Sequence, residues 1–382
     1  MSDRPRRAGR GHERADTAAA ADGAQGSRAP AAGRGRNRQP TGDALERDLA
    51  EVERQIRELR KITTAQRMDL NAQIAVLEAR AQELREAIAR DPAPWQTVQL
   101  ARHSERPKVG DYITALAKDF VELHGDRLSR DDPAIVAGLG VVEMPSSGTR
   151  SVAVIGHAKG RDTRENIARN FGMPNPEGYR KAVRVMKLAE KLRCPVVTLI
   201  DTPGAYPGQE AEERGQSEAI ARALLEMARL RTPIVTVITG EGGSGGALAI
   251  GIGDAVLMLQ HAVYSVISPE GCAAILWRDG SRAREAASAL RITARDLAAF
   301  GVVDEIVPEP PGGAHANPGA AVATVADAIK RRLGALLDRP ADELLGARYE
   351  KFRRIGRVRE MDVPTAPNAP GAPGPAAPDA PS

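Results

Sequence analysis

The segment best suited to chemistry is the glycine-rich run Gly240 to Gly251, which reads GEGGSGGALAIG. Five glycines fall within seven residues, directly after the apolar, β-branched run Pro233 to Ile238 and before an apolar helical stretch. Glycine permits sharp turns and leaves backbone NH groups uncovered. At a helix N-terminus such NH groups favour negative charge on a ligand oxygen. The segment therefore has the composition of an anion-binding turn.

Three functional interpretations of this run compete. A phosphate cradle would need the Lys and Ser/Thr of a Walker A loop, or a GxGxxG turn after a first strand, and neither pattern is present. A serine hydrolase matches the GxSxG pattern at Ser244, with Asp254, Asp304, His261 and His315 as candidate triad partners. An oxyanion hole without a nucleophile would use backbone NH groups alone, with Ser244 capping the helix through its hydroxyl. A purely structural glycine loop is the fourth reading.

A second loop, Asp201 to Gly208 (DTPGAYPG), ends the preceding predicted strand. The carboxyl ends of successive parallel strands lie at the same edge of a sheet, where ligand crevices form. Two prolines and two glycines in eight residues impose an irregular backbone whose NH groups could point at a ligand. Considered without the other loop, this composition favours an ordinary tight turn. The two loops can therefore face one site.

Basic side chains follow an earlier predicted strand and could meet an anionic cofactor such as coenzyme A. The candidates are Lys159, Arg161, Arg180 and Lys181, and a solvated basic helix face explains them equally well. Downstream, Tyr264 to Ile267 is predicted to be a strand that precedes a helix beginning near Pro269. Glu270 in that helix start suits a dipole partner better than a base.

The overall organisation is a helical start followed by an α/β core. Apolar residues spaced three and four apart from Leu45 to Leu59 and from Ile74 to Ile88 predict two amphipathic helices, a hairpin within residues 43–91. Beyond residue 130, apolar strands alternate with helical stretches, which predicts a largely parallel sheet covered on both faces. The predicted strands are Val152 to Ile155, Pro195 to Ile200, Pro233 to Ile238, Ala255 to Leu259, Tyr264 to Ile267 and Val302 to Val307; the predicted helices are Gly178 to Arg193, Glu212 to Leu230, Ala283 to Leu290 and Ala320 to Leu337.

Composition limits the remaining possibilities. The 382 residues carry a net charge of +4, and residues 1–42 alone hold nine Arg against four acidic residues, so the basic excess lies in this tail. We expect residues 1–42 and the Ala/Pro-rich residues 357–382 to be disordered, because neither can bury a core. Cys194 and Cys272 lack metal-ligand spacing and are expected to be core residues, and no metal site is predicted. Without a membrane span or secretory signal, the protein is expected to be cytoplasmic.

Several motifs in this order resemble the alpha subunit of the bacterial acetyl-CoA carboxylase carboxyltransferase, over about Asp43 to Gly356. The motifs are GHAKG at Gly156, NFGMPNPEGYRKA at Asn170, IDTPGAYPG at Ile200, AEERGQSEAIA at Ala211, GEGGSGGALAIG at Gly240, YSVISPEGCAAILW at Tyr264 and GGAH at Gly312. The departures are the two tails and the loop residues 145–148, which leave the implied function intact.

The resemblance implies a crotonase-type fold, a superhelix of strand-strand-helix units, over residues 92–356. It also implies transfer of a carboxyl group from carboxybiotin, held on the biotin carboxyl carrier protein, to acetyl-CoA, which gives malonyl-CoA for fatty acid synthesis. Loss of CO2 from carboxybiotin leaves a ureido anion that can take the acetyl proton, so the enzyme need not supply a base. Propionyl-CoA stays open as a substrate.

By resemblance, the NH groups of Gly245 and Gly246 form the alpha subunit's oxyanion hole for the biotin carbonyl. Gly204, Ala205 and Tyr206 form the facing wall, and Gly243 and Ala247 flank the hole. A Gly246→Val variant is expected to be inactive and Ser244→Ala to be tolerated.

The same resemblance implies partners. A carboxyltransferase beta subunit would supply the second oxyanion hole, most coenzyme A contacts and the zinc ribbon, within an alpha2beta2 heterotetramer. Biotin carboxylase and the carrier protein would complete the larger complex. The hairpin is a candidate docking element for the beta subunit, and a non-catalytic scaffold is the remaining alternative function.

Overall fold

The computed structural model describes residues 42–66, 70–90, 92–145 and 148–356. The tails predicted to be disordered therefore lie outside the described residues, except for Gly42. No helix in the described ranges is long and apolar enough to cross a membrane. Within the same ranges, no group of three or more His, Cys, Asp or Glu side chains is placed to hold a metal ion.

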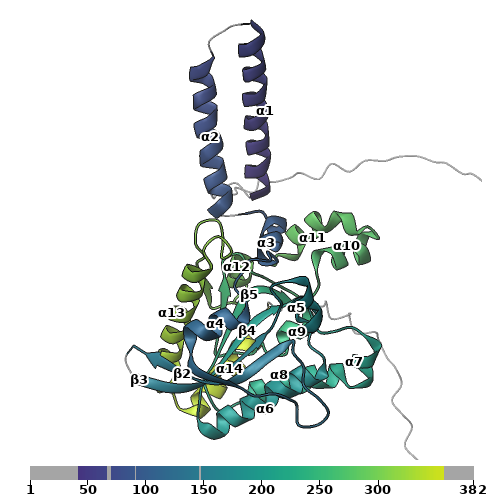
Figure 1. Ribbon diagram of the computed structural model, residues 1–382, viewed down its shortest axis with the longest axis vertical. Coiled ribbons are helices and arrows are strands. Elements are labelled where there is room, and N and C mark those ends of the chain that lie inside the picture. Colours follow the sequence, from purple (N-terminus) through teal and green to yellow (C-terminus); the bar gives the residue numbers. More distant parts are fainter. Residues whose placement is uncertain (1–41, 67–69, 91, 146–147, 357–382) are drawn as a thin grey trace, which may run out of the picture. The chain divides into compact units, whose positions relative to one another are not determined.

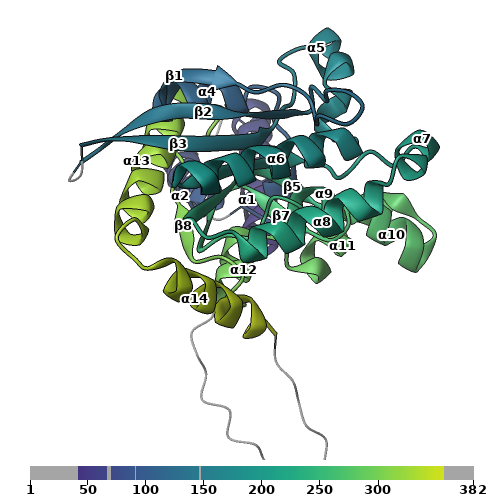
Figure 2. The same cartoon turned by 90° about the horizontal axis from the view of Figure 1, so that it is seen from below.

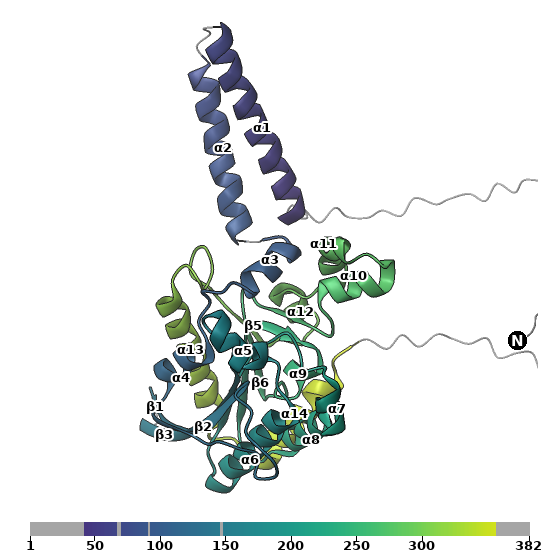
Figure 3. The ribbon, with the colours of Figure 1, turned by 45° about the vertical axis from the view of Figure 1, so that its right-hand side comes forward.

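The two predicted amphipathic helices are present as α1 (Gly42–Gln66) and α2 (Asn71–Arg90). Their apolar faces meet in a small core built around Ile56, Ile74 and Ala81 (Figures 1 and 3). Two ion pairs, Arg60–Glu78 and Arg85–Glu53, join the helices at the surface. Because exposed ion pairs contribute at most about 1 kcal/mol, the apolar stripe is the main source of the pairing.

The central feature is an eight-stranded mixed sheet with the order β1-β2-β3-β4-β5-β6-β8, in which β7 pairs with β5. β1, β2 and β3 pair antiparallel, and every pairing from β3 onward is parallel. The strands are β1 (Lys118–Glu122), β2 (Ile135–Met144), β3 (Gly148–His157), β4 (Val196–Thr202), β5 (Ile234–Gly243), β6 (Ala255–Leu259), β7 (Val263–Ser265) and β8 (Glu305–Val307).

Strand β5 changes partners along its length. Its first half pairs with β6, whereas its second half, Glu241 to Gly243, pairs with β7. The chain therefore passes from β6 to the short strand β7 and then into a helix, α10 (Pro269–Trp277). This is the strand-strand-helix unit expected of a crotonase-type fold, and the α/β prediction is confirmed.

Helices cover the sheet on both faces. Every residue of β4 is buried, which requires packing from either side. Helices α6 and α8 lie side by side (Figures 1 and 2), and α4 and α13 contact one another. The helices beyond the hairpin are α3 (Pro94–Ala101), α4 (Val109–Leu116), α5 (Thr163–Ala168), α6 (Pro176–Leu192), α7 (Gln209–Glu213), α8 (Gln216–Arg229), α9 (Ser244–Leu248), α10 (Pro269–Trp277), α11 (Ala283–Leu290), α12 (Ala294–Ala299), α13 (Pro318–Leu336) and α14 (Ala341–Arg353), with short 3-10 turns η1 (Asn170–Gly172) and η2 (Gly280–Arg282).

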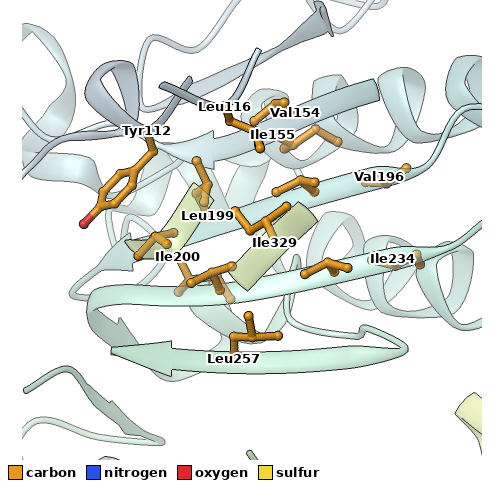
Figure 4. Close-up of a cluster of buried hydrophobic side chains, with 14 of the residues drawn as sticks. Tyr112, Leu116, Val154, Ile155, Val196, Leu199, Ile200, Ile234, Leu257 and Ile329 are labelled. Atoms are coloured by element: carbon orange, nitrogen blue, oxygen red, sulfur yellow. The ribbon is translucent and has the colours of Figure 1, made fainter. Parts of the chain in front are cut away.

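The core consists of branched aliphatic side chains from neighbouring strands. In Figure 4, Ile155, Leu199 and Ile200 belong with Tyr112 of α4 and Ile329 of α13 to one cluster of buried apolar side chains. All five side chains are at most 2% exposed. Burial of one large aliphatic side chain stabilises a fold by about 1.5 to 3 kcal/mol. Because a slip of one residue would turn these strand side chains to the other face of the sheet, their burial favours the observed register. Cys194 and Cys272 are buried as expected.

Three expectations from the sequence need correction. The helix predicted from Glu212 to Leu230 is two helices, α7 and α8, because Gly215 adopts a left-handed φ of 83° between them. The strands predicted at Tyr264 to Ile267 and Val302 to Val307 are only three residues long each. The antiparallel strands β1 and β2 were missed, although β2 is the first partner of β3.

Arg348 of α14 anchors the C-terminal helix to the sheet. Its guanidinium donates to both carboxylate oxygens of Asp254, at 2.9 and 2.8 Å. It also donates to the carbonyls of Met227 in the last turn of α8 and of Leu230 and Thr232 after that helix. The Arg348 side chain is 1% exposed. This residue therefore joins α14, α8 and the start of β6.

We predict that Arg348→Ala lowers the free energy of unfolding by about 3 to 5 kcal/mol, because it leaves Asp254 buried without its counter-charge. Urea unfolding followed by circular dichroism measures the loss. Arg354→Ala is the matched control, since Arg354 is exposed and its side chain donates only to the Glu350 carbonyl among the described residues. Equal midpoints for the two variants would contradict the anchoring role.

Candidate oxyanion site

The glycine run is not a loop but the end of a strand followed by a short helix. β5 extends to Gly243, five residues beyond the last apolar residue Ile238, and α9 begins at Ser244. Pairing with β7 accounts for the extension, because Glu241 to Gly243 pair in parallel with the residues of β7 and so continue the sheet. The helix N-terminus therefore sits directly at the carboxyl end of a sheet strand.

Two of the glycines allow the loops after β4 and β5 to meet backbone to backbone. A Cβ atom on Gly243 would lie 2.0 Å from the Pro203 oxygen, and one on Gly246 would lie 2.3 Å from the Ala205 nitrogen. Real Cβ atoms do not approach other atoms so closely, so no other residue fits at either position. Gly204 and Ala205 thus lie against α9, where the sequence placed them.

Tyr206, unlike Gly204 and Ala205, contacts the segment after η1 and its own loop. Its NH donates to the Pro174 carbonyl at 3.0 Å, and its ring lies over Gly208, where a Cβ atom would be 2.5 Å from the ring. Gln216 donates to the carbonyls of both Pro174 and Tyr206. The segment after η1 and the loop after β4 are therefore held together at this edge of the sheet.

The NH groups of Gly245 and Gly246 face no backbone acceptor among the described residues. The first four NH groups of a helix have no partner within it, and none of the turn or loop hydrogen bonds uses these two. Gly243 precedes the helix and provides no capping side chain. Gly245 is partly exposed and Gly246 is buried, so of these two donors only that of Gly245 reaches the surface.

Ser244 does not cap the helix, contrary to expectation. It is the first residue of α9 rather than the residue before it, and no side-chain cap hydrogen bond is made there. Its φ of 52° places it in the left-handed region, which costs of order 1 to 3 kcal/mol for a residue with a side chain. The strain is the consequence of turning from strand into helix without a loop.

The serine hydrolase interpretation is not supported by the geometry. Asp254 and Asp304 precede β6 and β8, at the opposite end of the parallel strands from Ser244. Asp254 is held by Arg348, and Asp304 is paired with Lys351. The His315 ring is stacked on His103 at 3.8 Å between ring centroids. His261 lies after β6, and its NH donates to Glu309 at 3.0 Å. The proposed triad does not assemble.

A pocket of about 280 Å³ opens beside the start of α9. Its wall is mainly apolar and comes from α9, β7, α12 and the residue Val302, with lining residues Ser244, Gly245, Leu248, Tyr264, Ser265, Val266, Leu297 and Val302. Burial raises the pKa of Tyr264 to about 12, so its hydroxyl remains protonated at neutral pH. Such a pocket suits an uncharged ring system that presents one oxygen to the NH donors.

Most of these lining residues were not predicted from the sequence to be part of the site. Tyr264 and Val266 were noted only as part of a strand, and Leu297 and Val302 carried no signal beyond being apolar. Conversely, Ala247 was expected at the site, but its side chain is fully buried in the core. It can contribute only its backbone.

The four candidate cations differ in availability. Lys181 is fully buried and donates to Asp131, and Arg180 donates to Asp126. Lys159 lies 2.7 Å from Asp201. Arg161 keeps 64% of its side chain exposed while paired with Asp111. Arg161 is therefore the one of these four that a solution anion can reach most freely.

The charged residues Lys159 and Asp201 form a partly buried pair after β3 and at the end of β4. Burial raises the pKa of the Asp201 carboxyl, but the Lys159 ammonium outweighs it and holds that pKa below its usual value. Asp201 also accepts from the NH of Glu241 at 3.0 Å. The pair therefore ties β3 and β4 to the second half of β5.

A comparison with known proteins identifies the family. The model of the acetyl co-enzyme A carboxylase carboxyltransferase-like family matches residues 43–356. The chain belongs to this family.

Its curated relatives are similar over nearly their whole length. The acetyl-coenzyme A carboxylase carboxyl transferase subunit alpha of Geobacter metallireducens is 52% identical over 316 residues, which cover 83% of this chain and 98% of the relative. The same subunit of Geobacter sulfurreducens is 58% identical over 72% of this chain and 84% of the relative. The predicted family, and with it the function as a carboxyltransferase alpha subunit, is confirmed.

Among solved structures, a transcarboxylase 12S with methylmalonyl-coenzyme A bound aligns with 60% of this chain and 42% of its own. The identity is 20% and the TM-score 0.49. A likeness of this size supports no conclusion on substrates or partners. The fold described above rests on the strand pairing itself.

His157, from the GHAKG motif, makes the stability of the fold depend on pH. It ends β3, is 1% exposed, and neither ring nitrogen has a hydrogen-bond partner in the described part of the chain. Burial lowers its pKa to about 4, against about 6.5 in an unfolded chain. The unfolded chain therefore takes up this proton first as the pH falls.

We predict that His157 stabilises the fold fully above pH ~6.5 and that this contribution is lost as the pH falls toward 4. Between pH 7 and pH 5 the loss should be about 2 kcal/mol. Urea midpoints of the wild type and His157→Gln at both pH values measure it. If the variant weakens as much as the wild type over this range, another group is responsible.

Proposed function

We propose that the NH groups of Gly245 and Gly246 bind the ureido oxygen of the biotin cosubstrate during carboxyl transfer to an acyl-CoA. Three observations support the proposal. The two NH groups face no backbone acceptor in the described ranges, Gly245 lines a pocket of about 280 Å³ with the buried Gly246 next to it in the chain, and that pocket is lined mainly by apolar side chains. Membership in the carboxyltransferase family supplies the reaction class.

Carboxybiotin, when bound, supplies the carboxyl group and a ureido nitrogen that can accept the acyl proton. The protein's part is then electrostatic. Negative charge that develops on an oxygen at the start of α9 is stabilised by donors that are already in place, and removal of one such donor costs about 3 to 4 kcal/mol. Gly204 and Ala205 hold these donors in position by direct backbone contact, and no side chain needs to act as a base.

The second substrate needs contacts that these residues do not supply. We propose that a carboxyltransferase beta subunit provides the other oxyanion hole, most coenzyme A contacts and a zinc ribbon, in an alpha2beta2 assembly with biotin carboxylase and the carrier protein. The description of the relatives as subunit alpha supports a multisubunit enzyme. Exposed Arg161 is the proposed contact for an anionic group of coenzyme A or the carrier.

The two helices α1 and α2 are the proposed docking element for the beta subunit. Their shared apolar core leaves charged side chains outward, and Val76 stays 69% exposed. The division of the chain at residues 42, 91 and 356, the cytoplasmic location and the choice of acetyl-CoA over propionyl-CoA remain predictions.

The glycine pair itself can be tested by adding one methyl group at each position. Gly246→Ala should abolish transfer, because its Cβ would lie 2.3 Å from the Ala205 nitrogen and would push the two loops apart. Gly245→Ala is the matched control for space, since its Cβ would lie 3.6 Å from Ile220. We expect this variant to assemble normally and to retain measurable activity. A fully active Gly246→Ala enzyme would contradict the proposal.

Reconstitution separates the proposed function from its alternatives. The chain, mixed with a beta subunit, should decarboxylate malonyl-CoA with biocytin as the acceptor, and either subunit alone should be inactive. Ser244→Ala should retain activity in the mixture, because the serine hydroxyl takes no part. Fluorophosphonate labelling of the lone chain would instead support the hydrolase, and no activity in the mixture would support a scaffold.

A further inference from the structure

Arg102 connects three elements around the pocket. It follows the last residue of α3, and its guanidinium donates through Nε and Nη2 to Oε1 of Glu241, at 2.9 and 2.7 Å. Its Nη1 donates to Oε1 of Glu270 at 2.6 Å. Neither the sequence motifs nor the proposed mechanism accounts for this residue.

Glu241 and Glu270 come before and after one pocket wall in the chain. Glu241 belongs to the part of β5 that pairs with β7, and Glu270 lies in the first turn of α10. The residues between them in the chain path include Tyr264, Ser265 and Val266, which line the pocket beside Gly245. Arg102 therefore joins β5, which pairs with β7, to the start of α10.

The arrangement depends on the guanidinium charge. Arg102 is 29% exposed and Glu241 11%, so their attraction is screened less than that of a surface pair. Burial opposes the charge on Glu270, but the hydrogen bonds from Arg102 hold the pKa of that carboxyl below its usual value. The nearest other cation to Glu241, Lys159 at 3.7 Å, is already bonded to Asp201. Without Arg102, two carboxylates would face the same space with that shared ammonium as the remaining counter-charge.

We propose that Arg102 is a positioning residue for carboxyl transfer: by holding Glu241 and Glu270 together it sets the distance between the Tyr264 to Val266 wall and the NH groups of Gly245. The inference rests on the proposed function of that pocket. Arginine is suited to this role because its planar fork presents donors in two directions at once, which an ammonium does with less geometric control.

The test is Arg102→Gln in the enzyme reconstituted with its beta subunit. A wall displaced by about 1 Å can cost 10- to 100-fold, so we expect KM for biocytin to rise, or kcat/KM for biocytin to fall, by that factor. KM for malonyl-CoA should stay unchanged, because its main contacts are proposed to lie on the other subunit. Arg102→Lys should recover part of the loss.

A second measurement does not depend on activity. Hydrogen exchange followed by mass spectrometry should be faster in residues 264–277 of Arg102→Gln, because the start of α10 loses its tether to β5. Arg332→Gln is the matched control, since it removes a partly buried pair with Glu305 at the other end of the strands. It should alter neither exchange in this segment nor KM for biocytin.

The kinetic results decide whether Arg102 positions the pocket wall. Unchanged KM and kcat with biocytin in Arg102→Gln would overturn the inference, as would an equal loss for both substrates together with a lowered melting temperature. The glycine-pair experiment judges the proposed function separately. If Gly246→Ala is inactive while Arg102→Gln behaves as the wild type, only the role of Arg102 fails; if Gly246→Ala is active, the proposed site itself fails.

Discussion

The structure depends on the direct contact between two backbones at the carboxyl edge of the sheet. Pro203 to Ala205 and Gly243 to Gly246 approach so closely that a single methyl group at Gly243 or Gly246 would overlap backbone atoms. This contact places a helix N-terminus against a rigid wall. The NH donors of α9 are consequently held in place before any ligand arrives, which is the condition for effective stabilisation of an oxyanion.

Several ionic contacts connect the strand ends at this edge of the sheet. Lys159 and Asp201 tie β3 to β4, and the NH of Glu241 joins the same carboxylate. Such partly buried pairs add little net stability compared with an apolar core, since desolvation of the charges offsets their attraction. They do, however, select one arrangement of the strand ends. The motifs GHAKG, IDTPGAYPG and GEGGSGG each contribute one charged residue to this network and their glycines to the loops, so the motifs meet in space although they are far apart in the sequence.

The far end of the sheet has a different character. There, Arg348 holds Asp254 and three carbonyls, and Lys351 pairs with Asp304. These residues join the C-terminal helix to the strands, and none of them is among the residues that line the pocket. Ion pairs thus join elements at both ends of the strands, while the proposed site lies at the carboxyl ends, where ligand crevices of parallel α/β sheets form. Two aspartates that looked like triad partners in the sequence prove to be part of this anchor.

The sequence by itself determined the family, the α/β class, the amphipathic hairpin helices and the position of the glycine turns, because motifs, periodicity and glycine content are local properties of the chain. Only the tertiary structure decided which residues meet. Ala247 is in the core, Lys181 is buried, Ser244 is strained rather than a cap, and Arg102 reaches Glu241 and Glu270 across 139 and 168 residues. Contacts over such separations follow from strand pairing and helix packing, which no local pattern encodes.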